Sequence, residues 1–124
     1  MNRQRPVNLN LLSIRFPVTS ISSISHRVTG VFLFIGVFVL LWLFGLSLES
    51  KQGFQSANEF IHSTFGRLLF WAILSSIAFH LIAGVRHLFM DAGIGESLEG
   101  GILGARLVLI LGAVAAVLIG VWLW

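Results

Sequence analysis

One histidine, His80, lies within a stretch of 18 residues, Leu68–Val85, that carries no formal charge. Hydrocarbon disfavours ionisable side chains, so a histidine there usually has a ligand, a partner or a path to water. A neutral imidazole with a free ring nitrogen is also a ligand for haem iron. The sequence therefore predicts an axial haem ligand at His80 or, as the alternative, a histidine that hydrogen-bonds a neighbouring helix.

His80 shares a helix face with residues that suit a flat cofactor. Gly84 and His87 follow it at i+4 and i+7, and Ser76 precedes it by one turn. These small residues would leave space for the edge of a macrocycle, and His87 at the wetter end could meet its propionates. The alternative is that His87, near the membrane surface, is structural.

A second stripe carries a cation. Ser23, Arg27 and Gly30 fall at i, i+4 and i+7. The Arg27 guanidinium could pair with a propionate or polarise a quinone carbonyl, with the Ser23 hydroxyl one turn away as a further donor. The alternative is an arginine that only anchors its helix at the membrane surface. His26 is expected to lie too near that surface to be an axial ligand.

Three apolar stretches must position these residues. The runs without charge have 21, 18 and 18 residues, close to the roughly 20 that cross a bilayer core of about 30 Å. We therefore predict an all-α integral membrane protein with three transmembrane helices. The expected organisation is a single membrane-anchor domain over residues 1–124, with an amino-terminal segment at 1–19 and helices at about 21–48, 65–91 and 103–124.

Local signals refine the ends of these elements. Thr19 or Ser20 is expected to cap the first helix, and Gly93 to stop the second. The loop between them could hold a short interfacial helix over residues 54–62. In the third helix, Gly112, Ala116 and Gly120 recur at four-residue spacing, which permits close approach of another helix or is only a scatter of small residues.

Composition excludes several kinds of chemistry within this chain. It is 56% hydrophobic and 10% charged and has no cysteine, so it holds no disulfide and no cysteine-bound iron–sulfur cluster. It also lacks a glycine-rich dinucleotide fingerprint and a phosphate-binding loop. If the protein serves a redox system, flavin and clusters belong to other subunits. The net charge of +3 indicates membrane orientation and not nucleic-acid binding.

Cations near the helix ends predict the orientation. One side would carry six (Arg3, Arg5, Arg15, Arg27, Arg86 and Arg106), and the other only two (Lys51 and Arg67). This favours a cytoplasmic amino terminus and a carboxyl terminus outside. His80 lies six residues before Arg86, roughly 9 Å deeper at 1.5 Å per residue. Because no other histidine lies at that depth, a second axial ligand would come from another chain.

Two segments resemble a known family. The run RPVNLNLLSIRFPVTSISSISHRVTG (5–30) and the run FHLIAGVRHLFMD (79–91) resemble the cytochrome b556 membrane-anchor subunits of bacterial succinate dehydrogenase, respiratory complex II. The two blocks S-x-x-H-R-x-[ST]-G and H-x-x-x-G-x-R-H-x-x-x-D are specific in combination. The resemblance covers nearly the whole chain, including its length and its three spans.

The resemblance implies a role in electron transport from the tricarboxylic acid cycle. It also implies that His80 is an axial ligand of haem b. The haem would lie in a heterodimeric helix bundle, formed with a second three-helix anchor subunit that supplies the other ligand. Ser23 and Arg27 match the ubiquinone site, and His26, Arg27 and His87 would lie near the haem propionates. Succinate oxidation, FAD and the iron–sulfur clusters would belong to a flavoprotein and an iron–sulfur subunit on the cytoplasmic face of the inner membrane.

Two other functions compete with this interpretation. The first is an anchor for a related fumarate reductase, with electrons flowing in the opposite direction. The second is a small transporter or channel subunit, which would need an acid or a polar pathway inside the membrane. The sequence disfavours that function because all five acids lie outside the three apolar stretches.

Overall fold

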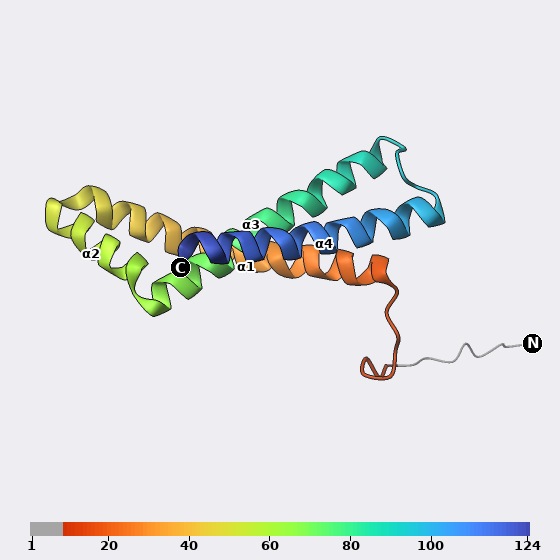
Figure 1. The fold of residues 1–124 in the computed structure, drawn as a ribbon, viewed down its shortest axis with the longest axis horizontal. Coiled ribbons are helices and arrows are strands. Elements are labelled where there is room, and N and C mark those ends of the chain that lie inside the picture. The colour runs from red at the N-terminus through yellow and green to blue at the C-terminus, as the bar shows by residue number, and fades with distance from the viewer. Residues whose placement is uncertain (1–8) are drawn as a thin grey trace, which may run out of the picture.

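The computed structural model describes residues 9–124. In that part of the chain four helices follow one another: α1 Val18–Glu49, α2 Lys51–His62, α3 Thr64–Asp91 and α4 Leu98–Leu123. Helices α1, α3 and α4 lie together along the long axis, and α2 folds back along the far end of α1 (Figure 1). Arg3 and Arg5, two of the cations used to predict orientation, lie outside the described residues.

Three of these helices can cross a membrane. With 32, 28 and 26 residues, α1, α3 and α4 are each long and apolar enough to span, which confirms the predicted fold class. At 1.5 Å per residue α1 is about 48 Å long, longer than a bilayer core of about 30 Å. The amphipathic helix α2 packs against the end of α1, where the sequence suggested a short helix over residues 54–62.

Three helices begin with the same local device, a serine followed three residues later by glycine. The hydroxyl groups of Ser50, Ser63 and Ser97 accept the backbone N–H groups of Gly53, Gly66 and Gly100 at 2.9, 3.0 and 3.1 Å. Each bond satisfies one of the free donors in the first turn of the helix. The Ser97 cap starts α4 at Leu98, five residues before the expected start.

The start of α1 also differs from the prediction. Neither Thr19 nor Ser20 is its cap, because the helix already begins at Val18 and Pro17 occupies the cap position without a side-chain bond. The Pro17 carbonyl accepts the N–H groups of Ser20 and Ile21. The end of α3 is as predicted: the helix stops at Asp91, and Gly93 has φ +81°.

The small residues of α4 pack against α3. A Cβ at Gly112 would overlap the Phe79 ring, and one at Gly120 would lie 3.3 Å from the indole nitrogen of Trp71. That nitrogen donates to the Ala116 carbonyl at 2.8 Å. The ridge at Gly112, Ala116 and Gly120 therefore permits close helix approach, one of the two interpretations of its spacing.

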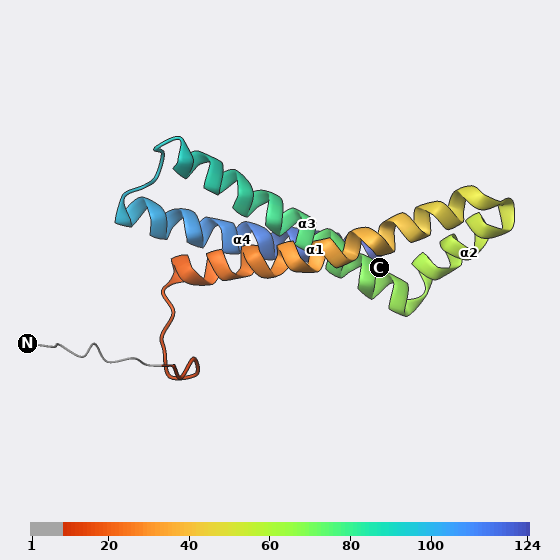
Figure 2. The same cartoon turned by 180° about the vertical axis from the view of Figure 1, so that it is seen from behind.

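Helix α3 also packs against α1. Gly36 of α1 gives room to Ile73, which is 1% exposed and is the largest fully buried hydrophobic side chain of the described residues. Seen from the two opposite sides, α3 crosses the other two long helices and diverges from α4 toward the α3–α4 turn (Figure 2). The α1–α3 crossing is the frame for the residues discussed next.

Candidate functional site

His80 lies half-buried where α3 packs against α1. Its ring nitrogen Nδ1 is 3.1 Å from the backbone carbonyl oxygen of His26 and 3.2 Å from the hydroxyl oxygen of Thr29. A carbonyl oxygen can only accept, so Nδ1 carries the hydrogen and donates it. The lone pair of the neutral imidazole is then on Nε2, the nitrogen that remains for a metal.

The rings of three histidines gather at this crossing. The His26 ring stacks on that of His80, with centroids 4.1 Å apart and planes at 29°. The His87 ring lies on the other helix near the same His26 ring, with centroids 5.0 Å apart and planes at 37°. Gly84 completes the predicted stripe of α3, and a Cβ there would lie 3.8 Å from His26 Nε2. His26 therefore contacts His80 directly.

His26 brings a buried polar atom without a partner. Its Nε2 is buried and has no hydrogen-bond partner among the described residues. A buried polar group of this kind is costly unless something supplies the missing bond. Within the described residues no group of three or more histidine, cysteine or acidic side chains is arranged to hold a metal ion, so the histidine cluster is not itself a metal centre of that type.

Arg27 faces away from the histidines. Its side chain is exposed and borders a shallow apolar groove on the outside of α1, lined also by Val28, Val31, Phe32 and Ile35. Ser23 is half-buried one turn earlier, whereas its neighbour Ser22 is 2% exposed and belongs to the packed face. The predicted stripe therefore divides: Gly30 contacts His80, and Arg27 opens to the outside.

A second groove runs between α1 and α3, close to His80. It shares Val28 and Phe32 with the Arg27 groove, and Ser76, one turn from His80, contributes to its wall. The remaining lining residues are Thr29, Trp71, Ala72 and Ser75. The Ser75 hydroxyl is buried and, within the described residues, has no hydrogen-bond partner. The two mostly apolar grooves meet at Val28 and Phe32, and Thr29 connects the second groove to the histidine cluster.

The residue that sequence reasoning missed is Thr29. Thr29 belongs to the first motif block without an assigned role, yet its hydroxyl contacts the ring of His80. Its spacing offered a signal, because Thr29 lies three residues after His26 and seven after Ser22, on the side of α1 that also carries Gly36. That side is the one packed against α3.

Fold and site together define a small multi-pass membrane protein whose polar residues gather at a crossing of two spanning helices. The model of the family described as succinate dehydrogenase/fumarate reductase transmembrane subunit matches residues 1–121. The chain belongs to this family.

Named relatives support the same assignment. The chain is 39% identical over 125 residues to the succinate dehydrogenase cytochrome b556 subunit of Coxiella burnetii (strain RSA 493 / Nine Mile phase I), with 100% of both chains covered. It is 34% identical over 95 residues to the subunit of that name from Paracoccus denitrificans, covering 77% of this chain and 73% of the relative. The cytochrome b560 subunit of Reclinomonas americana is 32% identical over 109 residues, with 80% and 72% covered. These similarities support a membrane-anchor role.

Proposed function

We propose that this chain is the membrane-anchor cytochrome b subunit of a succinate:quinone oxidoreductase, which binds haem b and contributes to the site of ubiquinone reduction. The observation that carries the proposal is the hydrogen bond from His80 Nδ1 to the His26 carbonyl oxygen. It leaves the Nε2 lone pair free within a membrane-length helix, and that is the state in which an imidazole ligates iron. The relatives' names, cytochrome b556 and b560 subunit, support the same prosthetic group.

The surroundings of His80 fit a haem. The buried, partnerless Nε2 of His26 suits a propionate oxygen, and the neighbouring His87 offers a further donor. Arg27 lies on the outer face of α1 and would reach a propionate only by turning its long side chain toward the cluster. The adjoining grooves provide the apolar surface that a macrocycle needs. When bound, the haem supplies reversible one-electron chemistry at its iron. In this proposal the second axial ligand comes from another three-helix anchor subunit.

Ser23 and Arg27 would hold the quinone. Arg27 stands at the edge of an apolar groove near the start of α1, where a ring can lie on Val28 and Phe32 with a carbonyl oxygen toward the guanidinium. Reduction places negative charge on that oxygen, and a fixed cation with a nearby hydroxyl stabilises the charge as it develops. The place of Arg27 near the start of α1, on the predicted cytoplasmic side, would give water access, so protons could reach the reduced quinone.

The remaining subunits complete the reaction. In this proposal a flavoprotein with FAD oxidises succinate, an iron–sulfur subunit carries the electrons, and both dock on the cytoplasmic face of the bacterial inner membrane. Large apolar side chains on α1, such as Phe34 at 69% and Phe38 at 59% exposure, are available to lipid or to the second anchor subunit. The amino terminus would be cytoplasmic and the carboxyl terminus periplasmic.

A fumarate reductase anchor is the second candidate. The family's description names both enzymes, which is the observation in its favour. The direction of electron flow follows from the potentials of the quinone and of the cofactors on other subunits. Comparing succinate oxidation by ubiquinone with fumarate reduction by a low-potential quinol, both catalysed by the purified complex, separates the two functions.

Replacing the axial ligand tests the proposed function. In the purified complex, His80→Leu should abolish or shift the reduced-minus-oxidised haem absorbance, because one ligand to the iron is lost. His62→Leu is the matched control, since His62 is exposed at the end of α2 and its Nδ1 bonds within its own helix, to the Asn58 carbonyl. An unchanged spectrum in His80→Leu, or a wild-type complex without haem absorbance, contradicts the proposal.

A further inference from the structure

Two residues of the first motif block, Thr29 and Gly30, have no role in the proposed function, yet both contact His80. The Thr29 hydroxyl oxygen lies 3.2 Å from His80 Nδ1. A Cβ built on Gly30 would lie 3.1 Å from His80 Cε1 and 3.7 Å from Nδ1. The ring of His80 thus rests on a short piece of α1 formed by the His26 carbonyl, the Thr29 hydroxyl and the bare backbone of Gly30.

We propose that Thr29 and Gly30 are positioning residues for the His80 ligand. Thr29 shares the Nδ1 hydrogen with the His26 carbonyl and so tunes the electron donation of Nε2, and Gly30 makes the space in which the ring lies. This inference rests on the proposed function, because it concerns how His80 is presented to haem iron.

The position of the Thr29 hydroxyl hydrogen decides which group donates in the hydrogen bond between Thr29 and His80. That hydroxyl lies 2.9 Å from the carbonyl oxygens of Ser25 and His26, both of which can only accept. Its hydrogen is therefore used within α1, and a lone pair faces His80 Nδ1. Two acceptors on one N–H raise the basicity of the ring, as partners of metal-bound histidines generally do. A more basic ligand favours the ferric iron and lowers the reduction potential.

Gly30 controls where the ring can lie. A contact of 3.1 Å is closer than carbon atoms normally approach, so any side chain at position 30 pushes the imidazole away from α1 and lengthens its bonds to His26 and Thr29. The comparison within the same helix is Gly45, where a Cβ would meet nothing within 4 Å. The lack of space for a side chain is thus a feature of Gly30 that Gly45 does not share.

Removing the hydroxyl tests the part played by Thr29. In the purified complex, Thr29→Val keeps the shape of the side chain but loses one acceptor, so the haem midpoint potential should rise. Thr29→Ser should return it to the wild-type value. Ser47→Ala removes a hydroxyl that bonds only the Phe44 carbonyl in the same helix and should change nothing. If Thr29→Val has the wild-type potential, or Ser47→Ala shifts it equally, the inference about Thr29 is wrong.

A methyl group tests the part played by Gly30. Gly30→Ala should change the largest g-value of the ferric low-spin haem, which reports the orientation of the axial rings, and lower haem content by about tenfold. Gly45→Ala should change neither. Identical g-values and haem content in both variants overturn the inference about Gly30. A wild-type complex without haem absorbance would overturn the proposed function as well. A haem that is lost in His80→Leu but is unaffected by substitutions at positions 29 and 30 would overturn this inference alone.

Discussion

At the scale of single residues, the site depends on which nitrogen of one imidazole holds the hydrogen. The His26 carbonyl accepts from His80 Nδ1 and also lies within reach of the Thr29 hydroxyl, so one helix carbonyl orders two side chains. Helix carbonyls are normally occupied by the helix itself, and an additional bond is common for threonine, which can bond three or four residues back. The backbone of α1 therefore fixes the tautomer of a residue on α3.

Arg27 is the residue on which quinone chemistry should depend. Arg27→Leu removes the cation at the edge of the α1 groove but keeps an apolar side chain there. Losing one donor to a developing oxyanion costs about 100-fold in turnover, so succinate:quinone reductase activity should fall by about that factor. Reduction of an artificial dye by the soluble subunits should persist, because it does not use this groove.

Arg67 provides the matched control for that experiment. It lies in the first turn of α3, at the end of the bundle opposite the start of α1. Arg67→Leu should leave both quinone and dye reduction near their wild-type rates. Normal quinone turnover in Arg27→Leu, or equal losses in the two variants, removes Arg27 from the quinone site.

At the scale of elements, the long helices could be predicted because their signal is a run of residues without charge. The start of α4 could not be read in that way. Its first turn contains Glu99, Gly100 and Gly101, which look like a loop, but the Ser97 hydroxyl caps them into a helix. Capping depends on one hydrogen bond and leaves little trace in composition.

The faces of the helices could not be predicted from the sequence alone. Counting residues places His80 roughly 9 Å below Arg86, on the side where Arg27 also lies, but depth does not say which way a side chain points. Three residues along a helix turn by about 300°, so Gly30 lies about 60° from Arg27. That difference is enough to put Gly30 against His80 and Arg27 on the outside. The partner helix α3 decides the face, and its approach is a tertiary property.

Close packing of α3 and α4 depends on Gly112. Gly112→Ala introduces a methyl group that overlaps the Phe79 ring, and overpacking of this kind destabilises by about 1–3 kcal/mol. The melting temperature of the purified complex should therefore fall. Gly101→Ala, in the same helix, meets nothing within 4 Å and should be neutral or slightly stabilising through helix propensity. Equal melting temperatures for the two variants would show that α4 does not need close contact at Gly112.

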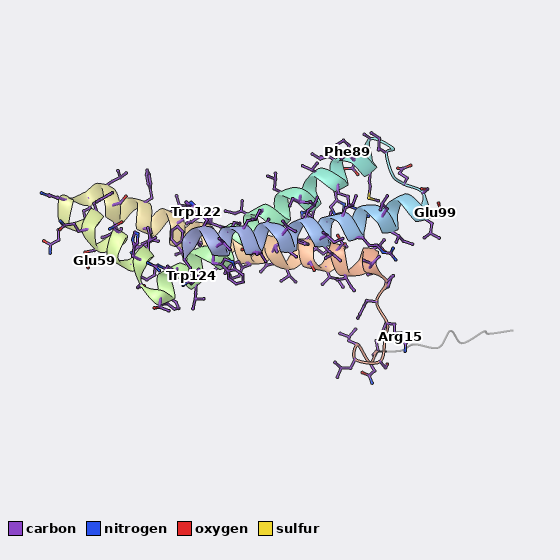
Figure 3. All side chains as sticks on the ribbon, in the orientation of Figure 1. Arg15, Glu59, Phe89, Glu99, Trp122 and Trp124 are labelled. Carbon is purple, nitrogen blue, oxygen red and sulfur yellow. The ribbon has the colours of Figure 1, made fainter. Side chains whose placement is uncertain are left out.

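At the scale of the whole molecule, polar and charged residues mark the two ends of the bundle. Figure 3 shows Arg15 and Glu99 toward the end where α1 starts and α3 turns into α4, and Glu59 toward the opposite end, on α2. The histidine cluster involves the first part of α1 and the last part of α3, and therefore lies toward the end with Arg15 and Glu99. Quinone, soluble subunits and cytoplasmic protons would meet at this end.

The absence of cysteine from the sequence allows a direct test of orientation. Gln55 is exposed on α2, and Glu96 is exposed in the α3–α4 turn, so a single cysteine at either place can react without disturbing the core. Because arginine and lysine accumulate on the cytoplasmic side, Gln55→Cys should react with a membrane-impermeant maleimide added outside the inner membrane of intact spheroplasts, and Glu96→Cys only after lysis. The reverse pattern would place the proposed quinone groove on the periplasmic side, away from soluble subunits in the cytoplasm. Labelling of both sites in intact spheroplasts would mean that α3 does not cross the membrane between them.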